Sequence, residues 1–403
     1  MKESSIISLR WGDKMKLVEL SKTEFNEFTN YLEICPFEQS IYWANFKSGE
    51  NWHPYFLGLE DKNKLLGATL LLANENKSIK KRFFYAPQGF LIDYKNYDLL
   101  EIFTKEIINF VKEKNGIYLK IDPEILTTEK DENGRELQGG INNLFIKDYL
   151  LKLGFIETDN NTLNPKYTMK LDLTDKSLND ILNNMSKKAR QIIKRNERLG
   201  YIVRELKQDE LPIFIKTMDK ISSKFNTIEY ELPFYEDLAS AFTKEHLKIM
   251  IAELDLNTTL NNLKKEEKVL QIEKEKRIGL YQNNQLTEET FIEKELGYKE
   301  QINIINKRRK YYLSLKEKTD NDKIFLGGYL FLMYGKEITA LIGGMDDEYI
   351  DLDVSYSIHF KMLKKAMEYG YRSYNFYEVK DVNDGGFFFK QNFGAKLFEH
   401  IGE

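Results

Sequence analysis

Residues 256–319 read LNTTLNNLKKEEKVLQIEKEKRIGLYQNNQLTEETFIEKELGYKEQINIINKRRKYYLSLKEKT, a stretch with 14 Lys/Arg, 10 Asp/Glu and no proline. Apolar residues recur at helical spacing on both sides of the polar run 282–285. Thr287 followed by two glutamates is an N-cap signal, because acids in the first turn complement the helix dipole. The stretch therefore predicts two antiparallel helices of about 28 residues each, which form an arm on the order of 40 Å long.

The heptad pattern alone leaves the role of this arm open. Glu267, Lys274 and Arg309 fall on the apolar seam and interrupt it. A charge-laced hairpin that only dimerises is therefore an equal alternative to a functional arm. The flanking sequence has to decide between the two interpretations.

The composition leaves room for two further domains. With 403 residues, of which 42% are hydrophobic, the chain outside the arm can bury two ordinary cores. A net charge of -4 argues against a wholly basic nucleic-acid coat, although 60 Lys and Arg allow local basic patches. The single cysteine, Cys35, excludes an internal disulfide and a multi-cysteine zinc site, and the four histidines lack metal spacing.

The N-terminus and the hydropathy pattern bear on the compartment. Residues 1–14 precede the first strand pattern, which begins at Met15, and are interpreted as an extension. The chain shows no signal-peptide core and no run of about 18 apolar residues. We therefore expect a soluble, cytoplasmic protein.

Alternating strands and helices predict an α/β (α+β) fold. Before residue 175 the patterns predict strands at 16–20, 54–60, 65–73 and 117–121, a helix at 97–114 and a surface loop at 127–142. From Asp175 helices followed by strands begin again, which favours a duplicated α/β domain. The arm interrupts this second unit, after a strand that ends near Ala252 and before a strand hairpin that ends at Gly344.

Two charged residues stand where a ligand is expected. Lys47 ends the aromatic stretch QSIYWANFK, and a cation among aromatics suggests an anionic ligand, although the aromatics alone are typical of a core. Asp122 follows the strand that ends at Ile121 and precedes a proline. This carboxylate is expected either to face a cleft or to cap its own bend as an Asx-turn.

Two further cationic stretches follow in the second half. Lys187, Arg190, Lys194 and Arg198 share one helix face, which favours binding of phosphate in nucleic acid or a pyrophosphate over a merely solvated face. Lys390 lies within GGFFFKQNFG, where it either snorkels from a helix or is held against a developing negative charge.

Six stretches of the sequence occur in the order FFYAPQGFLIDY, IYLKIDPE, MSKKARQIIKRNERLG, ALIGG, YRSYNFYEV and FFFKQNFG. Their order and spacing resemble those of the Fem family of peptidoglycan bridge-forming aminoacyltransferases. The resemblance runs from about Met15 to the end of the chain. It implies two GNAT-like acyltransferase domains with an inserted helical coiled-coil arm. The expected ranges are 15–164 for the first domain, with 391–403 as a candidate return to it, 165–390 for the second, and 254–319 for the arm.

The resemblance also implies the reaction and the residues that perform it. An aminoacyl group moves from its tRNA ester to the stem-peptide amine of a lipid-linked or UDP-linked muropeptide, with no cofactor and no metal. Catalytic roles fall to Lys390, which faces the oxyanion, and to Asp122, which orients or deprotonates the amine. Substrate binding is expected at Lys47, Trp43, Trp52, Tyr230, Phe234, Tyr349 and Phe389. Binding of tRNA is expected at Lys187, Arg190, Lys194, Arg198, Lys307, Arg308, Arg309 and Lys310.

One position departs from the family pattern. Tyr230, four residues before Phe234, stands where family members carry an arginine, so the phosphate contact of that arginine does not carry over. The resemblance further implies peripheral contact with the inner membrane face and related Fem-type transferases as candidate partners.

Two other functions remain as alternatives. An acyl-CoA-dependent N-acyltransferase shares the expected architecture, but the chain has no Arg/Gln-x-x-Gly-x-Gly/Ala turn to hold the CoA pyrophosphate. A non-catalytic tRNA-binding coiled-coil protein would explain the arm and the basic face. It would leave Lys47 and Lys390 without a role.

Overall fold

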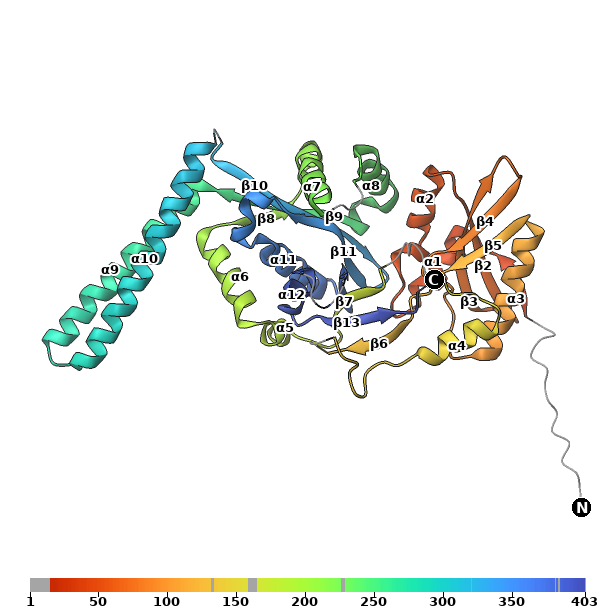
Figure 1. The fold of residues 1–403 in the computed structure, drawn as a ribbon, viewed down its shortest axis with the longest axis horizontal. Coiled ribbons are helices and arrows are strands. Elements are labelled where there is room, and N and C mark those ends of the chain that lie inside the picture. Colours follow the sequence, from red (N-terminus) through yellow and green to blue (C-terminus); the bar gives the residue numbers. More distant parts are fainter. Residues whose placement is uncertain are drawn as a thin grey trace, which may run out of the picture.

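The structure, a computed structural model, describes residues 15–131, 134–158, 165–225, 229–319, 321–380, 382 and 385–402. The extension expected before Met15 lies outside these residues. Figure 1 shows an elongated molecule with a smaller sheet at one end, a larger sheet in the middle and a helical arm at the other end. Within the described part of the chain, no helix is both long and apolar enough to span a membrane.

Five strands form the sheet of the first domain. In spatial order they are β1 (Lys16–Glu19), β2 (His53–Asp61), β3 (Lys64–Asn76), β4 (Lys81–Ala86) and β5 (Gly116–Ile121). Neighbours are antiparallel except β4 and β5, which are parallel because α3 (Tyr97–Glu113) crosses between them. As its amphipathic pattern predicts, α3 buries Leu100, Phe103 and Ile107.

Short helices complete the first domain. α1 (Lys22–Asn30) begins at a capping box in which Ser21 and Glu24 bind each other's backbone N–H groups. The 3₁₀ helix η2 (Phe37–Gln39) leads into α2 (Ile41–Gly49), and α4 (Leu144–Lys152) packs Ile146 and Leu150 into the core of this domain.

Eight strands form the sheet of the second domain. In spatial order they are β6 (Leu126–Lys130), β13 (Lys396–His400), β7 (Tyr167–Asp172), β12 (Ser373–Glu378), β11 (Glu337–Met345), β10 (Lys323–Tyr334), β9 (Leu247–Asp255) and β8 (Ile202–Glu205). Only β11 and β12 are parallel among these pairs of described strands. β10 and β11 form the predicted hairpin.

One segment corrects the sequence analysis. Part of the stretch 127–142, expected to be a surface loop, forms β6, and Thr127 and Thr128 in it are buried. The reason is its pairing with β13, in which Leu397 stands opposite Lys130 from the far end of the chain. The C-terminal residues thus join the larger sheet, while Ile401 donates its N–H to the carbonyl of Ile125 at 3.0 Å and packs in the core of the first domain.

Helices cover both faces of the larger sheet. On one face lie α5 (Leu178–Asn184), α6 (Lys187–Leu199), α11 (Val354–Glu368) and α12 (Gly385–Gln391). On the other lie α7 (Leu211–Phe225) and α8 (Leu232–His246), which share one core with α1 and α2. Two 3₁₀ helices, η3 (Gln208–Glu210) and η4 (Asp347–Leu352), complete the domain. The shared core makes the boundary between the two domains a packed one.

The arm consists of α9 (Leu256–Gln282) and α10 (Glu288–Lys318), inserted between the paired strands β9 and β10 as predicted (Figure 1). Thr287 is the N-cap of α10 and accepts the N–H of Thr290 at 3.3 Å. The charges expected to interrupt the seam bind across it: Glu267 pairs with Arg309, and Lys274 lies 3.9 Å from Glu295. They therefore belong to the contact between the helices.

Candidate active site

Helix α2 presents the first predicted cation. It begins at Ser40, whose hydroxyl accepts the N–H of Trp43 at 3.0 Å. In its last turn, the Nζ of Lys47 lies 4.9 Å from the Trp43 ring centroid and 5.2 Å from that of Phe46. The same Nζ lies 2.6 Å from a carboxylate oxygen of Glu50. The cation is thus held over aromatic rings by one exposed carboxylate.

The second domain supplies the opposite wall of this Lys47 site. Tyr230 stacks on Phe234 with 4.0 Å between ring centroids, and the Phe234 ring meets the edge of Phe46 at 5.6 Å. Burial, and then the negative charge of Glu50, raise the pKa of Tyr230. The structure therefore brings together four of the predicted substrate-binding residues, from α2, from α8 and from the residues just before α8.

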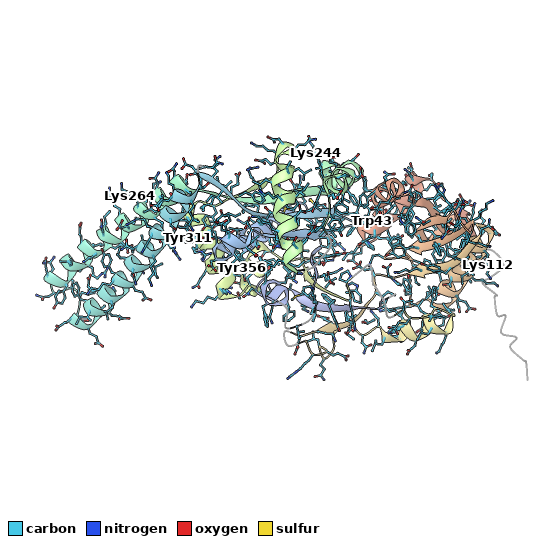
Figure 2. The ribbon with its side chains drawn as sticks, turned by 45° about the horizontal axis from the view of Figure 1, so that its top comes forward. Trp43, Lys112, Lys244, Lys264, Tyr311 and Tyr356 are labelled. Carbon is cyan, nitrogen blue, oxygen red and sulfur yellow. The ribbon has the colours of Figure 1, made fainter. Side chains whose placement is uncertain are left out.

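Trp43 lies between the two domains (Figure 2). Its indole Nε1 is buried and has no hydrogen-bond partner among the described residues. Because a buried indole N–H usually finds a partner, this donor is open to a ligand or to water.

Asp122 is connected to the Lys47 site through two aromatic residues. The N–H of Trp52 donates to the carbonyl of Lys47 at 3.1 Å, and the Trp52 ring lies 6.5 Å from that of Tyr85. Tyr85 donates its hydroxyl to Asp122 at 2.6 Å, and the N–H of Gln88 donates to the other carboxylate oxygen at 2.7 Å. Since these donors come from β4 and from the segment after it, Asp122 does more than cap its own bend. It lines a pocket of about 370 Å³ together with His400.

Lys390 lies on α12 and turns back toward the end of β12. Its Nζ donates to the carbonyl of Glu378 and, at 3.4 Å, to that of Tyr377. The neighbouring ring of Phe389 packs against Tyr356 at 4.8 Å and against His359 at 5.4 Å. The two predicted residues thus have different surroundings: the Phe389 ring packs against the core of the second domain, and the Lys390 amine is held by two backbone carbonyls.

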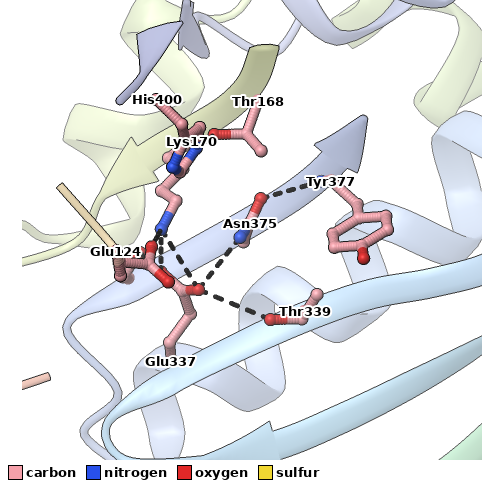
Figure 3. A network of polar contacts seen from close by, with 9 residues as sticks. Glu124, Thr168, Lys170, Glu337, Thr339, Asn375, Tyr377 and His400 are labelled. Atoms are coloured by element: carbon pink, nitrogen blue, oxygen red, sulfur yellow. Dashed lines mark hydrogen bonds and ion pairs between the residues drawn. The ribbon is translucent and has the colours of Figure 1, made fainter. Parts of the chain in front are cut away.

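A buried polar network was not predicted from the sequence (Figure 3). Lys170 on β7 lies 2.5 Å from Glu124, which follows Asp122 in the chain, and 3.2 Å from Glu337 on β11. The sequence showed no cation immediately after the acids at 122 and 124, because the partner is on another strand. A lysine in the middle of the buried strand YTMKLD was the available signal.

The cations of the predicted basic face of α6 differ in their surroundings. Some bind other parts of the protein, and some are exposed to solvent. Arg190 donates to the carbonyls of Leu182 and Met185 at 2.7 and 2.8 Å. Arg198 lies 3.1 Å from Glu266 on α9. The exposed members are Lys187, Lys194 and Arg198.

The four consecutive cations of α10 point in different directions around the helix. Lys307 and Lys310 are exposed, whereas Arg309 binds Glu267. Burial, and then the charge of Arg195, lower the pKa of the half-buried Arg308, with a further contribution from Arg198. The two predicted basic clusters therefore meet at the base of the arm.

Tyr349 lies apart from the Lys47 site. It belongs to η4 and packs against the core of the second domain. Burial, and then the charges of Glu348 and Asp346, raise the pKa of Tyr349, with a smaller contribution from Tyr311 on α10. Figure 2 shows Tyr311 where the arm joins the rest of the molecule and Trp43 toward the first domain. The structure thus places Tyr349 near the base of the arm.

Comparisons with known proteins agree over nearly the whole chain. The FemAB family model matches residues 20–403. The chain is 27% identical over 401 residues to the aminoacyltransferase FemA of Staphylococcus epidermidis, covering 96% of this chain and 95% of that protein. It is 26% identical to FemA of Staphylococcus aureus strain MRSA252, with coverage of 96% and 94%.

The fold is also found among solved structures. The crystal structure of FemX superimposes with a TM-score of 0.75 at 19% identity, covering 96% of each chain. The expected α/β architecture of two acyltransferase-type domains is confirmed. From the family match and these relatives, the chain belongs to the FemAB family.

Proposed function

We propose that this protein is an aminoacyltransferase that moves an amino acid from its tRNA ester to the stem-peptide amine of a peptidoglycan precursor. Family membership and the FemA relatives support the class of reaction. The observation that carries the proposal is the continuous line from Lys47 through Trp52 and Tyr85 to Asp122. It links the Lys47 cation, paired with the partly exposed Glu50, to a buried carboxylate at the boundary between the two domains.

The Lys47 site is suited to the acceptor. A phosphate that replaces the Glu50 carboxylate would gain the Lys47 charge, while the indole N–H of Trp43 is available as a donor. Tyr230 and Phe234 offer a stacked aromatic wall in place of the family's arginine. The acceptor is therefore a muropeptide whose phosphate group binds at Lys47 and whose amine extends toward Asp122.

The chemistry needs no enzyme nucleophile and no cofactor, because the donor ester is already activated. The acceptor amine attacks the ester carbonyl and a C–N bond forms. The resulting tetrahedral oxyanion collapses as the C–O bond to the tRNA ribose breaks, and the proton lost by the amine ends on the departing ribose hydroxyl. Asp122 orients the amine or takes its proton. Lys390, positioned by the carbonyls of Tyr377 and Glu378, donates to the oxyanion, which is worth roughly 3 kcal/mol when the cation is well aimed.

The tRNA is proposed to lie along the basic surface at the base of the arm. The exposed cations there are Lys187, Lys194, Arg198, Lys307 and Lys310. Phosphate contacts by such residues supply affinity without sequence readout. The donor fixes the site of action in the cytoplasm, and a lipid-linked acceptor would add peripheral contact with the membrane face.

One assay tests the proposal. Purified protein is offered tRNAs charged with Gly, Ala or Ser, together with UDP-linked and lipid-linked muropeptides, and products are identified by mass. The expected product carries one added amino acid on the stem-peptide amine. If no pairing yields a product while acetyl-CoA binds and is consumed with an amine acceptor, the acyl-CoA alternative replaces the proposal.

A further inference from the structure

Lys170 is a buried cation held by carboxylates from both domains. Its residue is 9% exposed, and its Nζ lies 2.5 Å from Glu124 of the segment after β5 and 3.2 Å from Glu337 of β11. Burial opposes its charge, but the two carboxylates outweigh burial and raise the pKa of Lys170. The lysine is therefore a fixed charge that ties the end of the first sheet to the second.

Glu337 is fully occupied by donors from its surroundings (Figure 3). Besides Lys170, it accepts from Ser373 at 2.5 Å, from Asn375 at 3.0 Å and from Thr339 at 3.4 Å. Carboxylates that bind this many donors are held in one geometry, because each lost bond leaves a buried group unsatisfied. Glu337 thus anchors Lys170 firmly on the second-domain side.

From Asn375 the network reaches Lys390. The side-chain oxygen of Asn375 accepts the N–H of Tyr377 at 2.8 Å, and the carbonyl of Tyr377 accepts from Lys390 at 3.4 Å. Tyr377 has φ 62, a left-handed conformation that is rare for a bulky residue, and the β12–β7 register shifts between Asn375 and Glu378. Asn375 therefore supports a strained residue, and that residue carries the carbonyl bound by Lys390.

At its other end the network reaches Asp122. Glu124 is separated from Asp122 only by Pro123, whose ring restricts the backbone between them. The N–H of Ile125 donates to the carbonyl of Pro123 at 2.6 Å, which tightens the same turn. A shift in the position of Glu124 is therefore expected to shift Asp122 as well.

We propose that Lys170 is a positioning residue that fixes Asp122 and Lys390 relative to each other, through Glu124 on one side and through Glu337, Asn375 and Tyr377 on the other. Folding stability alone does not account for the arrangement, because a buried ion pair seldom outperforms apolar side chains of similar volume. His400 lies beside Lys170 without competing for its partners. Burial, and then the charge of Lys170, lower the pKa of His400 to about 3, so it stays neutral.

This inference rests on the proposed function, and its test separates the two. Wild-type transfer from aminoacyl-tRNA is measured first; its absence would remove the proposed function, and with it the reaction that Lys170 serves. Given wild-type transfer, Lys170→Met is expected to lower kcat about tenfold or more while both KM values change less than about threefold, because misplacement of reacting groups acts on the chemical step. Lys170→Arg is expected to restore part of kcat.

Two milder variants keep the test decisive if Lys170→Met does not fold. Glu124→Gln loosens the Asp122 side and leaves Lys170 paired with Glu337, and Asn375→Ala loosens the Lys390 side. The effect of Glu124→Gln on kcat is expected to disappear in an Asp122→Asn background, and that of Asn375→Ala in a Lys390→Met background. If the role were purely structural, Glu124→Gln and Asn375→Ala would lower kcat by the same factor in these substituted backgrounds as in the wild type.

An ion pair of the same sheet whose lysine is mostly exposed provides the control. Lys396 on β13 lies 2.6 Å from Glu129 on β6, and its side chain is 60% exposed. Lys396→Met is expected to leave kcat unchanged. If folded Lys170→Met and Glu124→Gln enzymes match this control in kcat, or if their loss equals the loss of folded protein, the inference is overturned.

Discussion

The arm and the boundary between the two domains hold their charges in opposite ways. In the arm, Arg309 and Glu267 pair across the helices with side chains 30% and 25% exposed. At the boundary, the side chains of Lys170 and Glu337 are each 10% exposed, and their partners come from β11, β12 and the segment after β5. Exposed ion pairs contribute little to folding stability and are screened by salt. The stability of a buried ion pair depends on the presence of all its charge and hydrogen-bond partners. Changes in the arm should therefore alter substrate contact, and changes at the boundary should alter the reaction.

The largest effect is expected from Lys390→Met, at the boundary. Loss of the cation proposed to face the oxyanion should lower kcat/KM about 100-fold. The measurement is steady-state transfer with the aminoacyl-tRNA concentration varied. Lys361→Met, which removes an exposed lysine of α11, is the control. A kcat/KM that stays at the wild-type value would reject the oxyanion role.

The next largest effect concerns pH, the buried His359 and the partly buried His400. Burial, and then the charge of Lys390, lower the pKa of His359 to about 3, and burial does the same for His400. The folded protein keeps both rings neutral, so their stabilising effect is complete above the unfolded pKa of about 6.5 and is lost as the pH falls toward 3. At pH 5 each histidine should cost about 2 kcal/mol of unfolding free energy.

Urea unfolding at pH 7 and pH 5 measures this effect. Burial, and then the charge of Glu124, raise the pKa of Glu38, which acts in the opposite direction. The comparison is therefore made between the wild type and His359→Phe, whose pH 7 to pH 5 difference should be smaller by about 2 kcal/mol. The arm contains no histidine, so the effect belongs to the domains. Equal pH differences in the two proteins would contradict the neutral, buried His359.

A smaller effect, on substrate use, is expected from the cations of α10. Neutralising Lys307, Arg308, Arg309 and Lys310 should raise the KM for aminoacyl-tRNA severalfold and flatten its salt dependence, with the KM for the muropeptide unchanged. Because Arg309 is already bound to Glu267, the pair Lys307→Ala and Lys310→Ala should produce most of the change. Lys264→Ala with Lys268→Ala, on the exposed side of α9, is the matched control. An equal rise in KM for aminoacyl-tRNA and for the muropeptide would count against a tRNA contact.

The same contrast explains how far the sequence could predict the fold. The arm was predictable because its signals are local: helical spacing, the absence of proline and the Thr287 cap all lie within the segment. β6 was not, because its pairing with β13 joins residues about 270 positions apart, and its own sequence LTTEK resembles a loop. Pairing between strands that are distant in the sequence produces no periodic residue pattern in either segment.

The candidate site shows the same difference between local signals and contacts between distant segments. The aromatic setting of Lys47 could be predicted because Trp43 and Phe46 are one helical turn or less away. The network around Lys170 could not, since its members come from β7, β11, β12 and the segment after β5. For Arg190, the shared helix face was visible in the sequence, but the carbonyls of α5 that occupy it were not. Residue type indicated where a charged side chain was unusual, but the groups that bind this charge depend on the tertiary fold.

The smallest effect is expected at the seam of the arm itself. Replacing Arg309 and Glu267 singly and together, in a double-mutant cycle with Met and Gln, should give a coupling energy of about 0.5–1 kcal/mol, because both side chains remain partly in water. The measurement is urea unfolding at low and high salt, and the coupling should shrink at high salt. The matching cycle at Lys170 and Glu124 should give a larger coupling that salt barely changes. Equal couplings with equal salt dependence at the two sites would mean that burial does not separate them, and the contrast between arm and domain boundary would fail.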